Sequence, residues 1–396
     1  MKPLTTTLTV LKTKMTSKIL KPNNILIIAG ETSGDTLGSH LVQAILKQQP
    51  STNFIGFGGD KMQQAGVDIK MHCKDLAIIG IIEVIKKYKI IRRAFKIIKN
   101  IMNTKTIDLV VLIDYPGFNL RIAQQAHKRG IKVFYYTSPQ IWAWKYRRIK
   151  IIKRCVNHMA VLFPFEEKIY QREQVPVTFV GHPLAAKAKS SMSKIDAREH
   201  FELDQDKPVI GIFPGSRHSE IKSLLPIIID STEQISAQIP GAQWLLPLAP
   251  NLDRDHIQDL LPQNIKITQD NIYNAMQACD IAIAVSGTIT LELALLEVPS
   301  IIIYRTHSLT FMLAKCLVRT PYIGLCNIIA EQELAKELIQ QHATAHNIAN
   351  EVKFLLQNAT HYNDLKEKLH NLRLKLGNIM DDQTIANLVL NELTTN

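Results

Sequence analysis

Short apolar runs rich in valine and isoleucine alternate with longer segments of helical period along most of the chain. Six runs in the first half predict strands, at 24–30, 53–58, 107–114, 131–137, 158–163 and 177–181. Four runs in the second half do the same, at 208–215, 242–248, 281–287 and 300–305. Because most runs are apolar throughout and a helical segment usually follows, the pattern predicts α/β architecture with parallel strands in βα repeats.

The alternation is interrupted at 185–206, which has no apolar period and predicts a linker. A chain of 396 residues is also too long for one ordinary core. We therefore predict two Rossmann-like domains, 23–184 and 207–365, that face a cleft.

The two ends of the chain differ from the middle. Residues 1–22 are Thr-rich and basic without a usable period, so we expect a disordered tail, with Met15 as an alternative start. From about Glu331 the pattern is helical, and we expect residues 366–396 to form helices that cross back to the first domain.

Basic residues are concentrated in the first half. Residues 1–184 hold 29 Lys or Arg against 11 Asp or Glu, whereas residues 185–396 hold 18 against 24. This asymmetry indicates an anionic partner, either a phosphate-rich polymer or a phospholipid surface.

The segment 78–102 repeats apolar residues in steps of three and four beside a basic face. It predicts either a helix lying in a bilayer interface or a helix packed on the sheet with a solvated basic face.

Several classes of protein are disfavoured by what the sequence lacks. No apolar run is long enough for a membrane span or uninterrupted enough for a signal-peptide core. The chain has no GxxxxGK[ST] phosphate loop, no RNP-type aromatic pattern and no metal-ligand spacing among its five cysteines. These cysteines indicate reduced thiols.

Two turns in the second half are candidate anion sites. Ser286, Gly287 and Thr288 follow a strand and open a helix, where backbone N–H groups favour an anion. Glu292 lies one helical turn further, where its carboxylate could accept ribose hydroxyls, although the same residues also fit a simple capping signal. In the turn at 213–221, Ser216 and Arg217 follow Gly215, and arginine is a bidentate donor for phosphate oxygens.

The loops of the first half carry a different chemistry. Asp114 ends an apolar strand, so its carboxylate is partly desolvated and suits a general base, or it is a turn residue bound to its own backbone. We expect Asn119 to cap the following helix. Ser138, Gln140, Trp142 and Trp144 follow another strand and suit a wall against a sugar or acyl chain, or an interfacial anchor.

Taken together, these loops resemble one family in order and spacing, the lipid-A-disaccharide synthases. The motifs are GETSGD (30–35), DYPGFN (114–119), SPQIWAW (138–144), GHPL (181–184), PGSR (214–217) and SGTITLE (286–292). The resemblance implies a two-domain, inverting hexosyltransferase of the GT-B type that uses no metal and no cofactor. It would transfer 2,3-diacylglucosamine from UDP to the 6-hydroxyl of 2,3-diacylglucosamine 1-phosphate, on the cytoplasmic face of the inner membrane.

The resemblance also implies roles for individual residues. Asp114 would be the general base, Arg217 with the 286–288 turn would hold UDP, Glu292 would bind the ribose, and Asn327 matches a family asparagine near the donor. In the opening motif, we expect Glu31, Ser33 and Asp35 on the acceptor side, with Ser33 or Asp35 capping the helix and Glu31 orienting acceptor hydroxyls.

Two positions depart from the family pattern. The family often has a second aspartate where this chain has Gly117, so the role of base falls on Asp114. A proline usually precedes the asparagine that matches Asn327, and here Cys326 takes its place.

Other assignments share part of this evidence. They are another UDP-sugar GT-B enzyme, such as a peptidoglycan-type N-acetylglucosaminyltransferase, a UDP-sugar epimerase, or a basic nucleic-acid-binding protein. The SPQIWAW loop and the basic segment favour a lipid acceptor and an anionic membrane surface, with no nucleic acid. No motif gives the length or number of the acyl chains or the oligomeric state, and a homodimer stays open.

Overall fold

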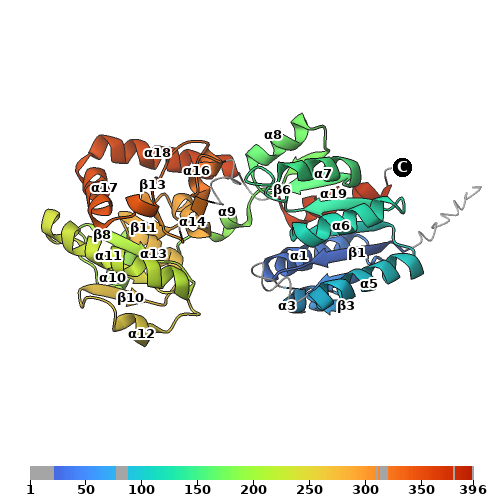
Figure 1. The fold of residues 1–396 in the computed structure, drawn as a ribbon, viewed down its shortest axis with the longest axis horizontal. Coiled ribbons are helices and arrows are strands. Elements are labelled where there is room, and N and C mark those ends of the chain that lie inside the picture. Colours follow the sequence, from blue (N-terminus) through green and yellow to red (C-terminus); the bar gives the residue numbers. More distant parts are fainter. Residues whose placement is uncertain (1–21, 77–87, 308–310, 313–319, 378–379, 395–396) are drawn as a thin grey trace, which may run out of the picture.

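The computed structural model describes residues 22–76, 88–307, 311–312, 320–377 and 380–394 (Figure 1). Its first sheet has seven parallel strands in the order β3-β2-β1-β4-β5-β6-β7. These are β1 (Asn24–Ala29), β2 (Asn53–Gly58), β3 (Val67–His72), β4 (Leu109–Ile113), β5 (Lys132–Tyr136), β6 (His158–Val161) and β7 (Val177–Phe179). The central strands are buried on both faces, as their uninterrupted apolar sequences require.

Helices connect these strands and cover both faces of the sheet. They are α1 (Thr32–Gln48), α2 (Asp60–Gln64), α3 (Cys73–Leu76), α5 (Tyr88–Thr104), α6 (Pro116–His127), the 3₁₀ helix η1 (Tyr146–Arg148), α7 (Ile149–Cys155) and α8 (Pro164–Arg172). Two hydrophobic clusters result, one on each side of the sheet.

The second sheet has six parallel strands in the order β10-β9-β8-β11-β12-β13. They are β8 (Val209–Phe213), β9 (Gln243–Pro247), β10 (Ile265–Thr268), β11 (Ile281–Val285), β12 (Ser300–Tyr304) and β13 (Lys336–Ile339). Around it lie α10 (Lys194–His200), α11 (His218–Gln238), α12 (Arg254–Gln258), α13 (Ile272–Ala278), α14 (Thr288–Leu295), α16 (Leu325–Ala330), η2 (Gln340–His342), α17 (Ala345–Gln357) and α18 (Ala359–Leu376). Together these elements enclose the core of the second domain.

All ten strands predicted from the apolar runs are present, and three further strands of the described residues were missed. The missed strands β3, β10 and β13 each lie at an edge of a sheet. An edge strand is covered less completely, so its sequence alternates with polar residues and gives a weaker signal. The prediction of purely helical structure after Glu331 is therefore wrong at β13, where Leu338 is buried between more exposed neighbours.

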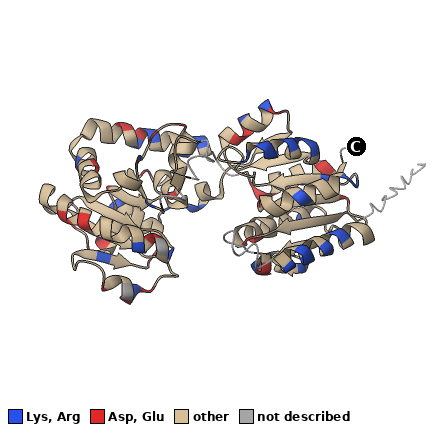
Figure 2. Ribbon diagram, in the orientation of Figure 1, with Lys and Arg blue, Asp and Glu red and all other residues tan. Residues whose placement is uncertain are grey.

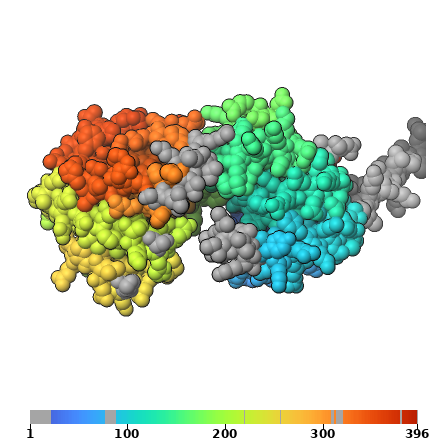
Figure 3. Space-filling view, in the orientation of Figure 1, coloured from blue at the N-terminus to red at the C-terminus, as the bar shows by residue number. Residues whose placement is uncertain are grey.

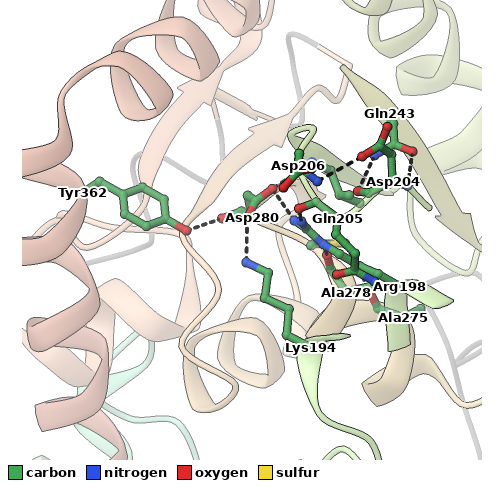
Figure 4. Close-up of polar contacts among 12 residues, drawn as sticks. Lys194, Arg198, Asp204, Gln205, Asp206, Gln243, Ala275, Ala278, Asp280 and Tyr362 are labelled. Carbon is green, nitrogen blue, oxygen red and sulfur yellow. Dashed lines mark hydrogen bonds and ion pairs between the residues drawn. The ribbon is translucent and has the colours of Figure 1, made fainter. Parts of the chain in front are cut away.

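The stretch 185–206, predicted as a linker, contains α10, which packs on α13 of the second domain. Figure 4 shows why α10 is held there. Asp280 accepts hydrogen bonds from Lys194 Nζ and Arg198 Nη2, both at 2.6 Å. Tyr362 of α18 donates to the Asp280 carbonyl oxygen at 2.9 Å. The passage between the domains is consequently shorter than predicted and centres on α9 (Pro183–Lys187).

The chain returns to the first domain at its C-terminal end, but later than predicted. Residues 366–376 belong to α18 and stay on the second domain, where α18 packs on α14 and α17. The final helix α19 (Asp382–Thr394) packs on α1. In Figure 1 this red helix lies among the blue and green elements of the first domain, apart from α17 and α18. Its residues Ile385, Ala386, Val389 and Leu390 complete a core of the first domain.

Helix α5 resolves the alternatives left by the amphipathic segment 78–102, of which residues 78–87 lie outside the described part. Its apolar side, including Ala94 and Ile98, is buried against the first sheet. Its basic side chains Arg92, Lys96 and Lys99 are exposed, and Figure 2 shows the basic residues along this helix. The helix is therefore packed with a solvated basic face, and its apolar face is not free to enter a bilayer.

Each sheet has one point where the strand order reverses, between β1 and β4 in the first and between β8 and β11 in the second. Ligands of open parallel sheets bind at the carboxyl ends of the strands at this point. The loops that begin at Gly30, Asp114, Pro214 and Ser286 all start there. The candidate site is built from these four loops.

Candidate active site

The turn after β1 owes its glycine, Gly30, to the neighbouring side chain of Tyr115 and not to a bound phosphate. A side chain at Gly30 would collide with the ring of Tyr115, so only glycine allows the strand to pass this close. Helix α1 then starts at Thr32 with Glu31 as its N-cap residue and no side-chain cap. Glu31 and Ser33 are exposed, and Ser33 lines a cavity between the domains.

Asp35 corrects one prediction, because neither it nor Ser33 caps α1. Its carboxylate is buried and accepts hydrogen bonds from the backbone N–H groups of Gly59 at 2.6 Å and Met62 at 3.0 Å. Asp35, in α1, thus caps the N-terminus of α2, and its negative charge interacts favourably with the positive end of the α2 dipole. This side chain fixes the scaffold beneath the site and does not face the acceptor side.

Asp114 stands in a strained turn at the end of β4. Asp114 and Tyr115 both have φ of 47°, the left-handed region that costs non-glycine residues about 1–3 kcal/mol each. The Asp114 carbonyl oxygen accepts hydrogen bonds from Tyr135 Oη at 2.7 Å and Asn119 Nδ2 at 2.8 Å. Asn119 lies inside α6, so it holds this turn and does not cap the helix as predicted. These two bonds maintain the strained turn and so fix the Asp114 side chain.

The Asp114 carboxyl has an acid–base range suited to proton transfer. Burial raises its pKa to about 6, and the nearby negative charge of Glu31 contributes in the same direction. A hydrogen bond to the Tyr115 backbone opposes this rise. The group is therefore mostly ionised at neutral pH yet basic enough to accept a proton.

The two domains form separate lobes (Figure 3), and a cavity of about 710 Å³ lies between them. The first domain contributes Asp114 and most of the residues predicted for the acceptor side, namely Ser33, Ser138, Gln140 and Trp144. The second domain contributes Thr288 and Leu325. Ser138 Oγ is itself engaged by Tyr170 Oη at 2.8 Å, so this serine helps to hold the wall of the cavity.

The two tryptophans of the 138–144 loop have different positions. Trp144 is 38% exposed and lines the cavity, whereas Trp142 is outside the cavity lining. Trp142 Nε1 donates to Glu166 Oε1 at 3.1 Å, and its ring packs edge-on against Phe165 at 5.2 Å. Trp142 therefore anchors the loop, and Trp144 is the one available to a ligand.

Glu166 and His182 also line the cavity, and the sequence analysis assigned neither a role. Burial raises the pKa of Glu166 to about 8, so this carboxyl is mainly protonated at neutral pH. Burial lowers the pKa of His182 to about 4, which leaves the imidazole neutral. His182 stacks on Phe163 at 4.9 Å and its Nδ1 accepts the Leu184 N–H at 3.2 Å. Only the GHPL motif pointed towards His182, and no spacing rule pointed towards Glu166.

A second pocket, of about 330 Å³, lies at the switch point of the second sheet. It is lined by the turns after β8 and β11, and it contains all but one of the residues predicted for the donor: Ser216, Arg217, Ser286, Gly287, Thr288 and Glu292. Gly215 has φ of 101°, so this turn requires glycine. Helices α11 and α14 begin at the pocket, where their first N–H groups favour an anion.

The polar side chains of this pocket have defined partners. Glu292 Oε1 accepts a hydrogen bond from Tyr273 Oη at 3.0 Å. Ser286 Oγ donates to the carbonyl oxygen of Ile323 at 2.9 Å, which leaves its oxygen available as an acceptor. Arg217 is 75% exposed and pairs with Glu220 at 2.7 Å. Glu220, which sequence analysis did not single out, therefore holds Arg217 at the pocket edge.

Asn327 is the one predicted donor residue outside this pocket. It is fully buried, and its Nδ2 donates to the Ala335 carbonyl oxygen at 2.7 Å and to Glu337 Oε1 at 2.9 Å. Its Oδ1 accepts the N–H groups of Leu334 and Ala335 at 2.8 Å. The donors and the acceptor of this amide are all bonded to other protein groups, so Asn327 has a structural role. It shapes the loop whose Ile323 carbonyl oxygen accepts the hydrogen bond from Ser286. Cys326, the departure from the family pattern, is buried beside it.

Thr288 connects the two sites, because it lines both the donor-side pocket and the interdomain cavity.

The described residues contain no group of three or more His, Cys, Asp or Glu placed to hold a metal ion. Among the helices of the described ranges, none has the length and apolar character needed to cross a membrane.

Solved structures with the same architecture are glycosyltransferases and related sugar-nucleotide enzymes. A glycosyltransferase of kitacinnamycin matches with a TM-score of 0.61 at 12% identity, over 94% of this chain and all of that one. The calicheamicin glycosyltransferase matches with a TM-score of 0.59 at 13% identity, over 95% and 99%. A UDP-GlcNAc 2-epimerase from Neisseria meningitidis, bound to UDP-GlcNAc, has a TM-score of 0.54 at 15% identity, over 94% and 100%. At such identities the likeness establishes the fold, which is that of the GT-B glycosyltransferases.

Sequence comparison then places the chain within this class. The family model for lipid-A-disaccharide synthetase matches residues 25–388. The lipid-A-disaccharide synthase of Coxiella burnetii is 47% identical over 368 residues, which cover 93% of this chain and 98% of the relative. That of Trichlorobacter lovleyi is 44% identical, over 93% and 97%. The chain belongs to the lipid-A-disaccharide synthase family and is a glycosyltransferase of lipid A biosynthesis. The family resemblance stated from the motifs is confirmed, and the rival assignments are not favoured.

Proposed function

We propose that the protein transfers 2,3-diacylglucosamine from UDP to the 6-hydroxyl of 2,3-diacylglucosamine 1-phosphate, releasing UDP and the β-1,6 disaccharide. The observation that carries this proposal is the position of Thr288, at the junction of the donor-side pocket and the cavity that holds Asp114. A sugar bound through its diphosphate at Thr288 would present its anomeric carbon to a hydroxyl at Asp114. The first domain thus takes the acceptor and the second takes the donor.

The chemistry needs one base and one anion site. Asp114 removes the proton of the 6-hydroxyl as its oxygen attacks the anomeric carbon on the face opposite the diphosphate. The bond to the diphosphate oxygen breaks, and UDP leaves with the electron pair, which inverts the configuration. Arg217 and the 286–288 turn, which line the donor-side pocket, stabilise the departing negative charge. No metal or cofactor is required by this scheme.

The remaining pocket residues act in binding. Glu292 Oε1 is held by Tyr273, so the carboxylate is oriented to accept ribose hydroxyls through its other oxygen. On the acceptor side, Ser33, Gln140 and Trp144 border the space for the sugar and the start of its acyl chains. Glu31 acts on Asp114 through its charge, which supports a place beside the acceptor hydroxyls.

Incubating the purified protein with UDP-2,3-diacylglucosamine and 2,3-diacylglucosamine 1-phosphate should yield the disaccharide 1-phosphate and an equal amount of UDP. Mass spectrometry detects the lipid product, and a coupled assay measures UDP. Release of UDP without a disaccharide would show a different acceptor and would contradict the proposal. Omitting the acceptor is the control, because any UDP formed then comes from hydrolysis.

We also propose that the first domain binds the cytoplasmic face of the inner membrane, where both lipid substrates would be found. The support is electrostatic: Arg92, Lys96 and Lys99 are exposed on α5, and the first 184 residues carry a large excess of basic residues. Because the apolar face of α5 is buried, attraction to anionic headgroups is the contribution this helix can make.

Changing Arg92, Lys96 and Lys99 together to glutamine should weaken binding to anionic vesicles about a hundredfold, since each basic residue contributes about 1 kcal/mol. Co-sedimentation with phosphatidylglycerol vesicles at low salt measures this. The matched control changes Lys222, Arg254 and Lys375, which are exposed on the second domain, to glutamine. An equal loss in both variants would mean that overall charge, and not this face, determines binding.

A further inference from the structure

Arg148 stands out among the residues of the interdomain cavity. It ends η1 and lines the cavity within the first domain. Across the described part of the chain, its guanidinium has neither an ion pair nor a hydrogen bond to another residue. Its guanidinium lies 5.2 Å from the centre of the Trp144 ring, which holds it by a cation–π contact.

The environment of Arg148 favours an anionic ligand. The side chain is partly withdrawn from water, and burial lowers its pKa from the usual value. A desolvated charge without a partner is unfavourable, and binding an anion offsets this cost. The planar guanidinium matches two phosphate oxygens, and its stacking on Trp144 leaves its hydrogen-bond donors free.

The charges around Arg148 are consistent with this role. Lys187, at the end of α9, lines the same cavity and adds a second cation. Glu166, the buried carboxyl of the cavity, is mainly protonated at neutral pH, so it does not act as a counter-ion for Arg148. Its two oxygens are already bonded to Trp142 Nε1 and the Phe163 N–H.

Arg148 lines the same cavity as the proposed base, Asp114. The fully buried Tyr135 donates to the Asp114 carbonyl oxygen, and its pKa responds to the charges of both Asp114 and Arg148. Both side chains therefore lie near Tyr135 while lining one cavity. A single sugar in this cavity could contact both.

We propose that Arg148, assisted by Lys187, binds the phosphomonoester of the acceptor, so that the cavity holds an anion subsite separate from the donor pocket. The inference rests on the proposed function, since it assigns the 1-phosphate of that acceptor a place. Arg148 is absent from the lining of the donor pocket, which has its own arginine, Arg217. Holding the phosphate at Arg148 orients the opposite end of the sugar, with its 6-hydroxyl, towards Asp114.

The test compares the acceptor with the same diacylglucosamine lacking the 1-phosphate. Arg148→Gln should raise KM for the phosphorylated acceptor about 10- to 100-fold, as expected for loss of a charge-assisted bidentate contact. The wild type should turn over the unphosphorylated acceptor poorly, and Arg148→Gln should not lower this turnover further. KM for the donor should be unchanged. The matched control is Arg147→Gln, because Arg147 is exposed and lines neither pocket. It should behave as wild type.

Several results would overturn the subsite. They are an unchanged KM for the phosphorylated acceptor, or an equal loss with both acceptors, which would indicate a structural role. A further arm measures binding to phosphatidylglycerol vesicles, because a lipid headgroup also carries a phosphate. Weaker vesicle binding in Arg148→Gln than in Arg147→Gln, with no change in acceptor preference, would assign the arginine to the membrane surface. Absence of disaccharide from the wild-type enzyme would instead reject the proposed function itself.

Discussion

Asp114→Asn should lower kcat for disaccharide formation about 10²- to 10⁴-fold and leave UDP affinity unchanged. The amide is isosteric with the carboxylate but cannot accept the hydroxyl proton. The strained turn should persist, because Tyr135 and Asn119 bond to the backbone carbonyl of residue 114 and not to its side chain. Initial rates of disaccharide formation and calorimetric titration with UDP measure the two quantities.

The pH dependence checks the same residue. The base must be ionised, so activity should rise as the pH increases through about 6, the pKa of Asp114, and should be lost below it. Glu31→Gln removes one cause of the raised pKa, and the acidic limb of the profile should then move to lower pH. Asp68→Asn is the control, since Asp68 is exposed on the edge strand β3 and pairs with Lys70. Turnover retained in Asp114→Asn would exclude Asp114 as the base.

Arg217→Gln should lower both the affinity for UDP and kcat. In this it differs from Asp114→Asn, which should lower kcat alone. Loss of a bidentate contact to a diphosphate should weaken UDP binding about 10- to 100-fold. In the free protein Arg217 pairs with Glu220, but the arginine is 75% exposed, so screening by solvent limits the pair to about 1 kcal/mol. A diphosphate can replace this partner at small cost. The dissociation constant of UDP from calorimetry gives the first quantity, and initial rates give the second.

The control for Arg217 is Arg254→Gln, an exposed arginine of α12 in the same domain that does not line the donor pocket. It should bind UDP as the wild type does. If Arg217→Gln also binds UDP normally, the anion site depends on the helix starts and the hydroxyls of the 286–288 turn alone. Asp114→Asn and Arg217→Gln together separate the step of proton removal from the binding of the leaving group.

The sequence was most informative where burial is complete. Central strands such as β1 and β4 are apolar on both faces, so their sequences allow few secondary structures other than a buried strand. Once these strands were located, the loops after them were located as well. The edge strand β13 has only one buried residue in four, and its pattern merged with the helices around it. Local signals identify the interior of a sheet better than its boundary.

The direction of a polar side chain was harder to predict than its position in the chain. Asp35 and Trp142 lie in predicted motifs, yet each bonds to a segment that the sequence does not place beside it. Asn119 bonds back to the carbonyl oxygen of Asp114 instead of capping its helix. Glu166 and Arg148 were missed because they belong to no motif that ends a strand. Their importance comes from burial and from the partners they have or lack, which depend on the tertiary structure.

The return of α19 to the first domain has a consequence for how this protein can be made. The core that α19 completes contains β1, the first strand of the described residues, so the first domain cannot finish folding until α19 has been synthesised. Next to that return, the backbone N–H of Met380 donates to the carbonyl oxygen of Val180, at 3.0 Å, just before α9. One backbone hydrogen bond thus ties the outgoing chain, just before α9, to the returning chain, just before α19. The two ends of the first domain are therefore joined to each other at the point where the chain leaves for the second domain.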